Sequence, residues 1–513
     1  MVSCIALEES RLHAATFGAY SDYWEHTAVL HALIENPWHP GNPHLLSPAS
    51  SPRYGPLSVL NGLLARALGL DAPSALSVAA VVHTALFVLG IWSFFRVYFR
   101  DRRAGLYGLL VMLGGWWEAW TFTSIYQPKV LLSVACYPWL AAFAVTLLGL
   151  ALEAHVIRQS RPHILQYSGL VVCMWVVFLT HQVTAMMALA AWFLLALTEP
   201  RVPLPRRIAV ALTAVAGCAF SIFWPYFSVF NLLAGGHQEA GWVGHGIEVA
   251  TQAAPNPVEE LHRFYRLKEL LPALGLGLLG VAALPYFFLT WRRLFVGLGV
   301  LAMLGPFALN AYVPLPLGHR FILLAVFFLH VAVVWLLLAL TPGSPEFARV
   351  LDRRFLRAAS LATVWAILGT FAWHNVRRTE REWNYFASYA SRGRSPLLRL
   401  SKRVAELTDK DSVVMGDTLT TWPIPCYGPK VVALRHENPF VPDAAERVAA
   451  VDRFFERNTR DDERAQLIAR YRVTHVVVKG DAFGSLRPFL EAHAKRLRLV
   501  PGYWLYALTA STR

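Results

Sequence analysis

The sequence predicts a polytopic α-helical membrane domain followed by a small soluble α/β domain. Hydrophobic residues make up 56% of the 513 residues, and charged residues make up only 16%. Soluble domains carry about 25% charged residues, so most of this chain is suited to a bilayer. The last stretch differs, because short β-branched runs alternate there with amphipathic helical patterns, which is typical of an α/β domain.

Composition also argues against several functions. The net charge is +14, but in so apolar a chain an excess of arginine marks cytoplasmic loops, and no nucleic acid is expected as a partner. The five cysteines form no CxxC pair, which argues against a disulfide framework or a zinc site. The C-terminal stretch lacks a GxGxxG sequence and a P-loop, so no nucleotide site is expected there.

We divide the chain into three regions. Residues 1–72 are expected to form a first loop on the outer face with interfacial helices, because residues 1–19 are too charged for a signal peptide or a span. Residues 73–375 are expected to form a transmembrane domain of about ten helices, with a long outer loop at residues 231–270. Residues 395–513 are expected to form an extracytoplasmic α/β domain.

Long apolar runs predict the spans. They cover residues 74–99, 104–122, 128–153, 164–180, 182–198, 208–230, 271–290, 294–313, 320–341 and 357–374. Residues 55–70 are apolar but short and contain Arg66, so we expect an interfacial or shallow helix there.

The short loops between the spans predict their orientation. Alternate loops are rich in arginine: Arg100, Arg102, Arg103, Arg158, Arg161, Arg201, Arg206, Arg207, Arg292, Arg293, Arg349, Arg353, Arg354 and Arg357. The intervening junctions hold only Lys129 and Arg320, apart from three basic residues in the long loop. By the positive-inside rule the arginine-rich loops are cytoplasmic. The first loop and everything after residue 373 therefore lie on the outer face.

The first loop carries two acids and a histidine at helical spacing. Asp22, Glu25 and His26 share one side of a helical turn. A carboxylate at a membrane surface can act as a general base toward a hydroxyl or amine acceptor. We assign this catalytic role to Asp22, with Glu25 and His26 in support, while a helix N-cap is the alternative for Asp22. The three side chains are also candidate ligands for a divalent metal such as Mg or Mn.

Two aromatic residues, Tyr23 and Trp24, stand within this acidic turn. Aromatic rings favour membrane–water interfaces, so we expect Tyr23 and Trp24 to face the interface and to shield Asp22. Residues 36–51, which follow, are rich in proline, asparagine and histidine and predict a long polar loop.

Further candidates stand where the predicted spans reach the outer face. Glu118, near the outer end of the second span, is a candidate catalytic acid, and a snorkelling side chain is the alternative. Lys129 begins the third span and is either a phosphate ligand or an interfacial anchor. His181 marks the turn between two spans and either contacts substrate or is a satisfied interfacial histidine.

Arg320 and the long loop complete the candidate set. Arg320 enters an apolar span from the outer side, where a guanidinium needs an anionic partner. That partner is either a substrate phosphate or the carboxylate of Asp22 or Glu118. His237 is a candidate substrate ligand in the glycine-rich loop at residues 231–270, which is either a mobile lid or a plain connection.

The C-terminal stretch predicts strands within residues 411–417, 430–435, 473–479 and 497–508, and helices near residues 395–408, 443–457 and 461–471. Strands that alternate with helices favour a sheet with helices packed on its faces.

Together these features resemble the GT-C superfamily of integral membrane glycosyltransferases, which use polyprenyl-phosphate-linked sugars. The resemblance rests on a carboxylate in the first outer loop, interfacial helices after it, many spans, a long late outer loop and an arginine at the top of a late span. The C-terminal phrases DSVVMGD, GPKVVAL and LIARYRVTHVVVK are similar to the tail domains of bacterial members.

The resemblance implies that Asp22 is the catalytic acid and that Arg320 binds the donor phosphate. The family usually has a second acid directly after the first, whereas this chain has Tyr23 there and Glu25 further on. The family's second-loop acid region falls near residues 118–127. Family members also usually begin with a membrane span, and none precedes Asp22 in this sequence.

These observations predict a multi-pass enzyme of the bacterial inner membrane. It would transfer a hexose or pentose, with inversion, from a polyprenyl-phosphate-linked donor to a glycan, lipid or protein acceptor. The alternative is a non-enzymatic membrane transporter or cell-envelope scaffold whose outer domain binds a partner. Transporters usually show internal repeats and charges near the bilayer midplane, and the polar residues here stand at span ends instead.

Overall fold

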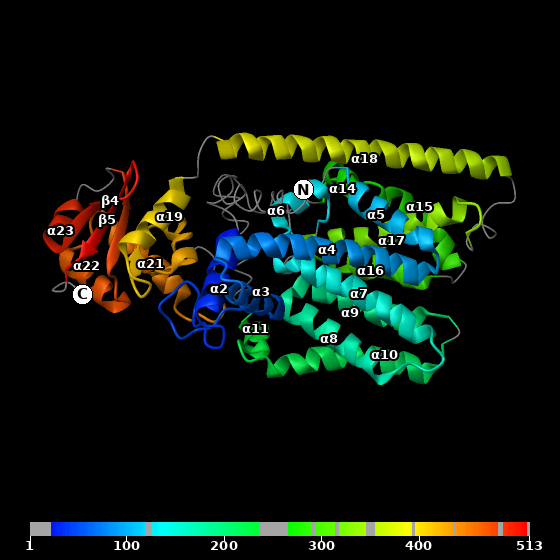
Figure 1. Cartoon of the computed structure of the whole chain (residues 1–513), viewed down its shortest axis with the longest axis horizontal. Coiled ribbons are helices and arrows are strands. Elements are labelled where there is room, and N and C mark those ends of the chain that lie inside the picture. The colour runs from blue at the N-terminus through cyan, green and yellow to red at the C-terminus, as the bar shows by residue number, and fades with distance from the viewer. Residues whose placement is uncertain are drawn as a thin grey trace. The chain divides into compact units, whose positions relative to one another are not determined.

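The chain folds into two compact units (Figure 1). The computed structural model describes residues 22–117, 125–200, 202–235, 265–289, 293–312, 318–344, 354–391, 396–434, 438–480 and 486–509. The first unit comprises Met1–Ala79, Trp224–Trp242 and Tyr385–Arg513, and the second comprises Ala80–Phe223 and Val243–Asn384. The first loop and the C-terminal stretch therefore belong to the same unit.

The second unit is helical. Its elements are α4 (Ala72–Phe99), α5 (Arg102–Gly114), α6 (Pro128–Val134), α7 (Pro138–Arg158), α8 (Ile164–Thr180), α9 (Gln182–Thr198), α10 (Leu204–Phe220), η1 (Ser221–Phe223), α14 (Leu267–Leu274), α15 (Gly277–Leu289), α16 (Leu294–Leu309), η2 (Gly318–Arg320), α17 (Phe321–Leu340) and α18 (Arg354–Ser391). Helices α4 and α18 continue into the first unit.

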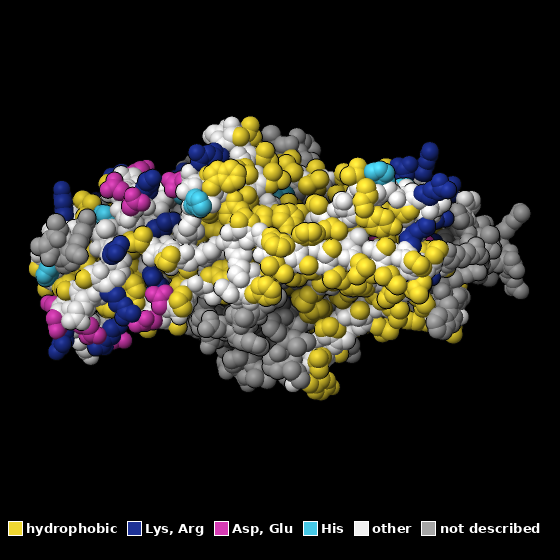
Figure 2. Space-filling model, turned by 90° about the horizontal axis from the view of Figure 1, so that it is seen from below, with side chains coloured by type: hydrophobic (Ala, Val, Ile, Leu, Met, Phe, Trp, Pro, Cys, Tyr) yellow, Lys and Arg dark blue, Asp and Glu magenta, His cyan; other side chains and the backbone are white. Residues whose placement is uncertain are grey.

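Several of these helices are long and apolar enough to cross a membrane, and the protein is a multi-pass membrane protein. Among the described residues four helices qualify singly: α4, α7, α10 extended by η1, and α17. Helices α14 and α15 qualify together but bend by 79°, and α8, α9 and α16 are shorter apolar helices. Figure 2 shows the broad apolar surface that the helices present.

The predicted third span is wrong as a single helix. It divides into α6 and α7, because Pro138 begins α7 and the preceding residue, Tyr137, is extended (φ −77°, ψ 143°). Proline is favoured in the first turn of a helix and cannot continue one that precedes it. The predicted second span also ends early, since α5 stops at Gly114.

Helix α17 forms the centre of this unit, and nearly all of its side chains are buried. Helix α15 packs closely against it, because a Cβ atom at Gly280 would lie only 2.4 Å from the carbonyl oxygen of Leu329. Small residues allow this backbone approach between membrane helices. The ring of Tyr286 stacks on Trp335 at 4.5 Å and extends the same contact.

The first unit combines helices with one sheet. Its elements are α2 (Tyr23–Glu35), α3 (Pro56–Ala67), α11 (Val229–Gly235), α19 (Pro396–Leu407), β1 (Val413–Met415), α20 (Thr418–Thr421), η4 (Ile424–Tyr427), β2 (Lys430–Val431), α21 (Ala444–Phe455), α22 (Asp461–Tyr471), β3 (His475–Lys479), α23 (Leu486–His493), β4 (Ala494–Arg498) and β5 (Tyr503–Leu508).

The five strands form one mixed sheet in the order β2-β1-β3-β5-β4. Strand β1 runs parallel to both β2 and β3, whereas β5 is antiparallel to β3 and β4. The predicted α/β architecture is thus confirmed, with one correction. A single last strand was expected within residues 497–508, but a hairpin of β4 and β5 is present. Strand β4 escapes a pattern search because it is a charged edge strand, Ala-Lys-Arg-Leu-Arg.

Helix α3 occupies the position of the expected interfacial helix. Its leucines Leu60 and Leu64, followed by Leu68 just after the helix, are about half exposed or more. Their spacing of four residues places them along one stripe of the helix. An exposed apolar stripe of this kind suits a helix that lies in a membrane surface.

Candidate active site

Asp22 stands at the start of helix α2, in a helical backbone conformation with φ −57° and ψ −7°. Its carbonyl oxygen accepts a hydrogen bond from the backbone N–H of His26 at 3.1 Å. Its half-buried carboxylate makes no capping hydrogen bond to the helix. The alternative role of Asp22 as a side-chain cap is therefore not fulfilled.

The neighbouring aromatic residues correct one expectation. Tyr23 and Trp24 are each only 1% exposed, so they do not face a membrane–water interface. Their rings contact edge to face at 5.3 Å. The carbonyl oxygen of Trp24 accepts a hydrogen bond from the Cys426 thiol at 3.2 Å. Burial, together with the nearby Glu25, raises the pKa of that thiol and keeps it a donor.

Glu25 lies at the centre of a buried polar cluster, which we call the Glu25 cluster: Glu25, His44, Arg53 and Trp422. The Glu25 carboxylate accepts a hydrogen bond from Trp422 Nε1 at 2.6 Å. Its other oxygen lies 3.3 Å from His44 Nε2 and 3.6 Å from Arg53 Nε. A buried carboxylate needs such donors to offset the loss of hydration. The cluster thus ties α2 to its own loop and to the C-terminal sheet region.

The loop after α2 packs onto the edge of the sheet. Leu45 forms a parallel bridge with Val431 of β2, and the Val431 N–H donates to the His44 carbonyl at 2.8 Å. Lys430 Nζ donates to the carbonyl oxygens of Asn42 and Pro43 at 2.9 and 3.2 Å. The first loop therefore covers the edge of β2, which would otherwise present unpaired backbone groups.

Two further segments of the chain hold the same loop. Trp224 Nε1 donates to the Tyr54 carbonyl at 2.9 Å, and the Tyr226 hydroxyl donates to the Pro37 carbonyl at 2.7 Å. Asn438 Nδ2 donates to the Ser50 carbonyl at 2.9 Å. The loop predicted from its prolines is present, but side chains from distant segments fix its path.

His31 makes the stability of this unit sensitive to pH. Burial lowers the pKa of His31 below its ordinary value of 6.5, Lys430 adds to this shift and Glu35 opposes it. The folded state therefore protonates His31 only at a lower pH than the unfolded chain does, whose imidazole has the ordinary pKa of about 6.5. We expect the melting temperature to fall on acidification below pH 6.5, and the fall to be smaller in His31→Gln. Thermal unfolding of both proteins over a pH series checks this, and equal pH dependence would contradict it.

In the second unit, Lys129 lies in the first turn of α6 and is half-buried. The residue before this helix is anchored, because Gln127 Nε2 donates to Asn375 Oδ1 at 2.7 Å. Asn375 in turn donates to the carbonyl oxygens of Gly114 and Trp116. The paired side-chain amides of Gln127 and Asn375 therefore fix the backbone just before Lys129.

His181 and Arg320 come together within the second unit. His181 ends α8 and caps α9, with its Nδ1 2.8 Å from Thr184 Oγ1. Arg320 ends η2 directly before α17. The Arg320 charge acts electrostatically on the His181 imidazole, so two of the predicted substrate ligands are neighbours although they are far apart in sequence.

Two predicted site residues, Glu118 and His237, lie outside the described residues. Within the described ranges, no group of three or more His, Cys, Asp or Glu side chains could hold a metal ion. The proposed metal set of Asp22, Glu25 and His26 is therefore not formed, because Glu25 turns toward the Trp422 indole.

Solved structures resemble the chain over almost its whole length. ArnT from Cupriavidus metallidurans in the apo state gives a TM-score of 0.53 at 13% identity, covering 95% of this chain and 93% of that chain. Its complex with undecaprenyl phosphate gives 0.52 at 12% identity, covering 100% and 97%. The apo Archaeoglobus fulgidus oligosaccharyltransferase gives 0.51 at 13% identity, covering 99% and 74%. Both proteins are GT-C membrane glycosyltransferases.

The chain has the GT-C fold. No family model matches the sequence, and no curated protein matches it. The GT-C resemblance drawn from the residues is confirmed at the level of the fold, which is what similarity at 12–13% identity establishes.

Within this GT-C fold, sequence reasoning missed His44, Arg53 and Trp422 as partners of the first loop. The one signal in the sequence is the stretch Trp-Pro-Ile-Pro-Cys-Tyr-Gly at residues 422–428. An aromatic and proline-rich turn between two strands cannot be a helix of the usual α/β connection, and it indicates a surface that packs against something else.

Proposed function

We propose that this protein is a glycosyltransferase that moves a sugar from a polyprenyl-phosphate carrier to an acceptor on the outer face of a bacterial inner membrane. The observation that carries the proposal is the GT-C fold over nearly the whole chain, combined with Asp22 at the start of the first-loop helix. One ArnT structure that resembles this chain over its whole length is bound to undecaprenyl phosphate, which supports a carrier of that chemistry.

Asp22 is the proposed general base. It takes the proton from an acceptor hydroxyl or amine as that atom attacks the anomeric carbon of the sugar. The bond from the anomeric carbon to the carrier phosphate oxygen then breaks, and the polyprenyl phosphate leaves with the electron pair. A single displacement of this kind inverts the anomeric centre. The acceptor is a glycan, a lipid or a protein.

Glu25 has a different proposed role from the catalytic one expected of it. Its carboxylate is engaged by Trp422, His44 and Arg53, so it holds α2 in place and acts on the reaction only through the position of Asp22. His26 lies one turn after Asp22 on the same helix and is proposed to contact the acceptor.

Arg320, His181 and Lys129 are the proposed ligands of the donor phosphate. A guanidinium can bind two phosphate oxygens at once, and an ammonium adds a point charge. In the leaving carrier the phosphate gains negative charge, so the cations stabilise the departing group as well as the bound donor.

Lipid analysis tests the donor assignment. We expect mass spectrometry to find a polyprenyl-phosphate sugar with the purified wild-type protein. The amount of this lipid that co-purifies with Arg320→Ala should be lower by a factor of roughly ten or more. The matched control is Arg377→Ala, which removes an arginine that is 56% exposed in its side chain and pairs with Glu380 at the surface. Bulk phospholipid alone in wild type, or equal loss in both variants, would remove the support for Arg320 as the donor anchor.

One observation favours the transporter alternative. Helices α14 and α15 are bent by 79° at a short break, as in a broken span or a re-entrant loop, and discontinuous helices often build transporter sites. A transporter would move a labelled carrier lipid across the membrane of proteoliposomes without forming a new glycosidic bond. The proposed enzyme, by contrast, forms that bond in detergent. Product formation in detergent therefore separates the two functions.

A further inference from the structure

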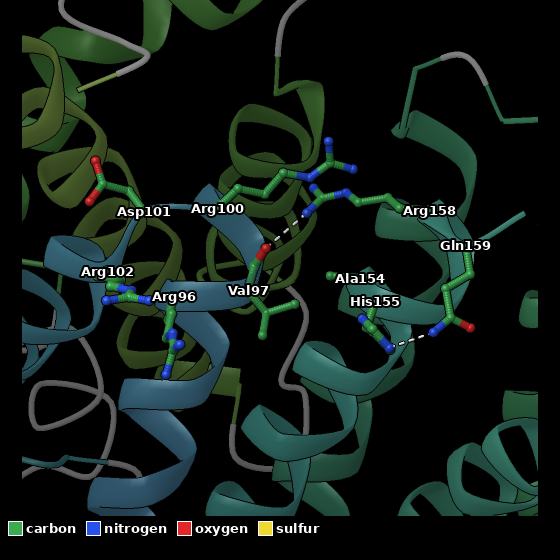
Figure 3. Close-up of a pocket in the computed structure, with 9 residues that line it drawn as sticks. All are labelled: Arg96, Val97, Arg100, Asp101, Arg102, Ala154, His155, Arg158 and Gln159. Carbon is green, nitrogen blue, oxygen red and sulfur yellow. Dashed lines mark hydrogen bonds between the residues drawn. The ribbon is translucent and has the colours of Figure 1, made fainter. Parts of the chain in front are cut away.

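A pocket of about 510 Å³ opens in the second unit, at the end opposite the candidate donor-phosphate ligands. It is lined by the end of α4, the turn into α5 and the last turn of α7 (Figure 3). The loop after α17 lies at this same end, because Arg103 donates to the Pro342 carbonyl at 2.6 Å. Helix α17 has 20 residues and spans about 30 Å, which separates the pocket from Arg320.

Four arginines line this pocket, which we call the α4–α7 pocket: Arg96, Arg100, Arg102 and Arg158. In Figure 3 the guanidinium groups of Arg100 and Arg158 point toward one another. Arg96 lies over the ring of Trp92 at 4.7 Å, and His155 adds a further nitrogen-bearing side chain to the wall. Like charges gathered in one hollow repel one another unless an anion enters it.

Two acids near the α4–α7 pocket, Asp101 and Glu199, are already engaged. Asp101 caps α5, with its carboxylate accepting from the Arg103 N–H at 2.8 Å. Glu199 receives two hydrogen bonds from Arg158, at 2.6 and 3.0 Å. Among the described residues, no acid forms an ion pair with Arg96, Arg100 or Arg102. The charges of these three arginines are therefore available to a ligand.

The backbone at Arg100 is the second indication. Arg100 has a left-handed conformation with φ 57°, which ends α4. Glycine occupies such a position without strain, whereas arginine does not. Its side chain is directed to the pocket in spite of this cost, which points to a role for the guanidinium.

The surroundings indicate where the ligand comes from. Helices α4 and α7 are both long enough to cross a membrane, so the pocket at their ends lies at a membrane surface. Leu89 and Trp92 on α4 and Leu106 on α5 are 48%, 38% and 56% exposed. An acyl chain can lie along these residues while its headgroup reaches the arginines.

We propose that the α4–α7 pocket binds a phosphate anion, supplied by the headgroup of an anionic lipid or by a soluble phosphate compound. Basic pockets between membrane helices recognise phosphate headgroups in this way. The site is separate from the proposed donor site and does not depend on the transfer reaction.

Native mass spectrometry of the whole protein in detergent tests the proposal. Phosphatidylglycerol, phosphatidylcholine and inorganic pyrophosphate are titrated separately into wild type, Arg100→Gln and the control Arg161→Gln, which removes an exposed arginine outside the pocket. We expect phosphatidylglycerol to bind more tightly than phosphatidylcholine, and Arg100→Gln to weaken it about fivefold or more. We expect Arg161→Gln to bind as wild type does.

Each result decides the question. Pyrophosphate binding that needs Arg100, without preference for the anionic lipid, supports the phosphate site and assigns its ligand to the soluble source. Equal binding of the two lipids without any pyrophosphate binding would overturn the proposal, as would equal weakening in Arg100→Gln and Arg161→Gln. Arg100 is exposed, and unchanged melting temperatures show that the variants remain folded.

Discussion

Replacing Asp22 with asparagine is expected to lower sugar transfer by about 10²–10⁴-fold, the contribution typical of a general base. The amide keeps the size of the side chain but cannot take a proton from the acceptor. Because the Asp22 carboxylate makes no capping hydrogen bond, the substitution leaves the helix start intact, and the melting temperature should stay within a degree or so. The rate of transfer from a synthetic polyprenyl-phosphate sugar measures the effect.

The matched control is Asp411→Asn, which makes the same change at an exposed position in the C-terminal region. It should transfer sugar at the wild-type rate. Full activity in Asp22→Asn would contradict the assignment of Asp22 as the general base. Bound donor lipid in an inactive Asp22→Asn protein would separate the acid–base role from donor binding.

Replacing Glu25 with alanine is expected to destabilise the first unit by about 3 kcal/mol. The change leaves the Trp422 N–H, His44 and Arg53 in a buried cluster without the carboxylate that they share. Glu25→Gln should cost less, about 1 kcal/mol, because its amide oxygen still accepts from Trp422. Chemical or thermal unfolding followed by tryptophan fluorescence measures both changes.

Glu406→Ala is the control, since Glu406 is 60% exposed in its side chain and pairs with Arg403 at the surface. Surface pairs contribute about 0–1 kcal/mol. If Glu25→Ala is no more destabilising than Glu406→Ala, the Glu25 cluster does not hold the loop. Transfer activity separates the roles of Glu25: retention of most activity in Glu25→Gln indicates positioning, whereas loss as complete as in Asp22→Asn indicates chemistry.

The architecture of this chain could be predicted from its sequence because periodicity and composition report it directly. Unbroken apolar runs gave α4, α8, α9 and α17 close to their true limits, and β-branched runs gave β1 and β3. The breaks between α6 and α7 and between α14 and α15 are harder to predict from the sequence. A short gap in a hydrophobic run changes its mean hydropathy little, although it changes the direction of the helix.

The candidate site was predictable only in part. Helical spacing correctly placed Asp22, Glu25 and His26 on one turn, but it carries no information about what that turn packs against. The partner of Glu25 is Trp422, which is 397 residues away. Likewise, the sequence marked His181 and Arg320 separately by their positions at span ends, and only the packing of α9, η2 and α17 against α16 brings them near one another.

The contact between residues 22–55 and the β2 edge has a consequence for biogenesis. Protein synthesis proceeds from the N-terminus, and domains generally fold as their last partner emerges. Helix α2 is made early, yet Trp422 and Val431 reach it only after every membrane helix has been synthesised. Until then Glu25 and the backbone of the loop stay in water. In a chain truncated before residue 422, helix α2 near the N-terminus would stay unpacked. A quality-control protease would recognise the truncated chain by this exposed helix.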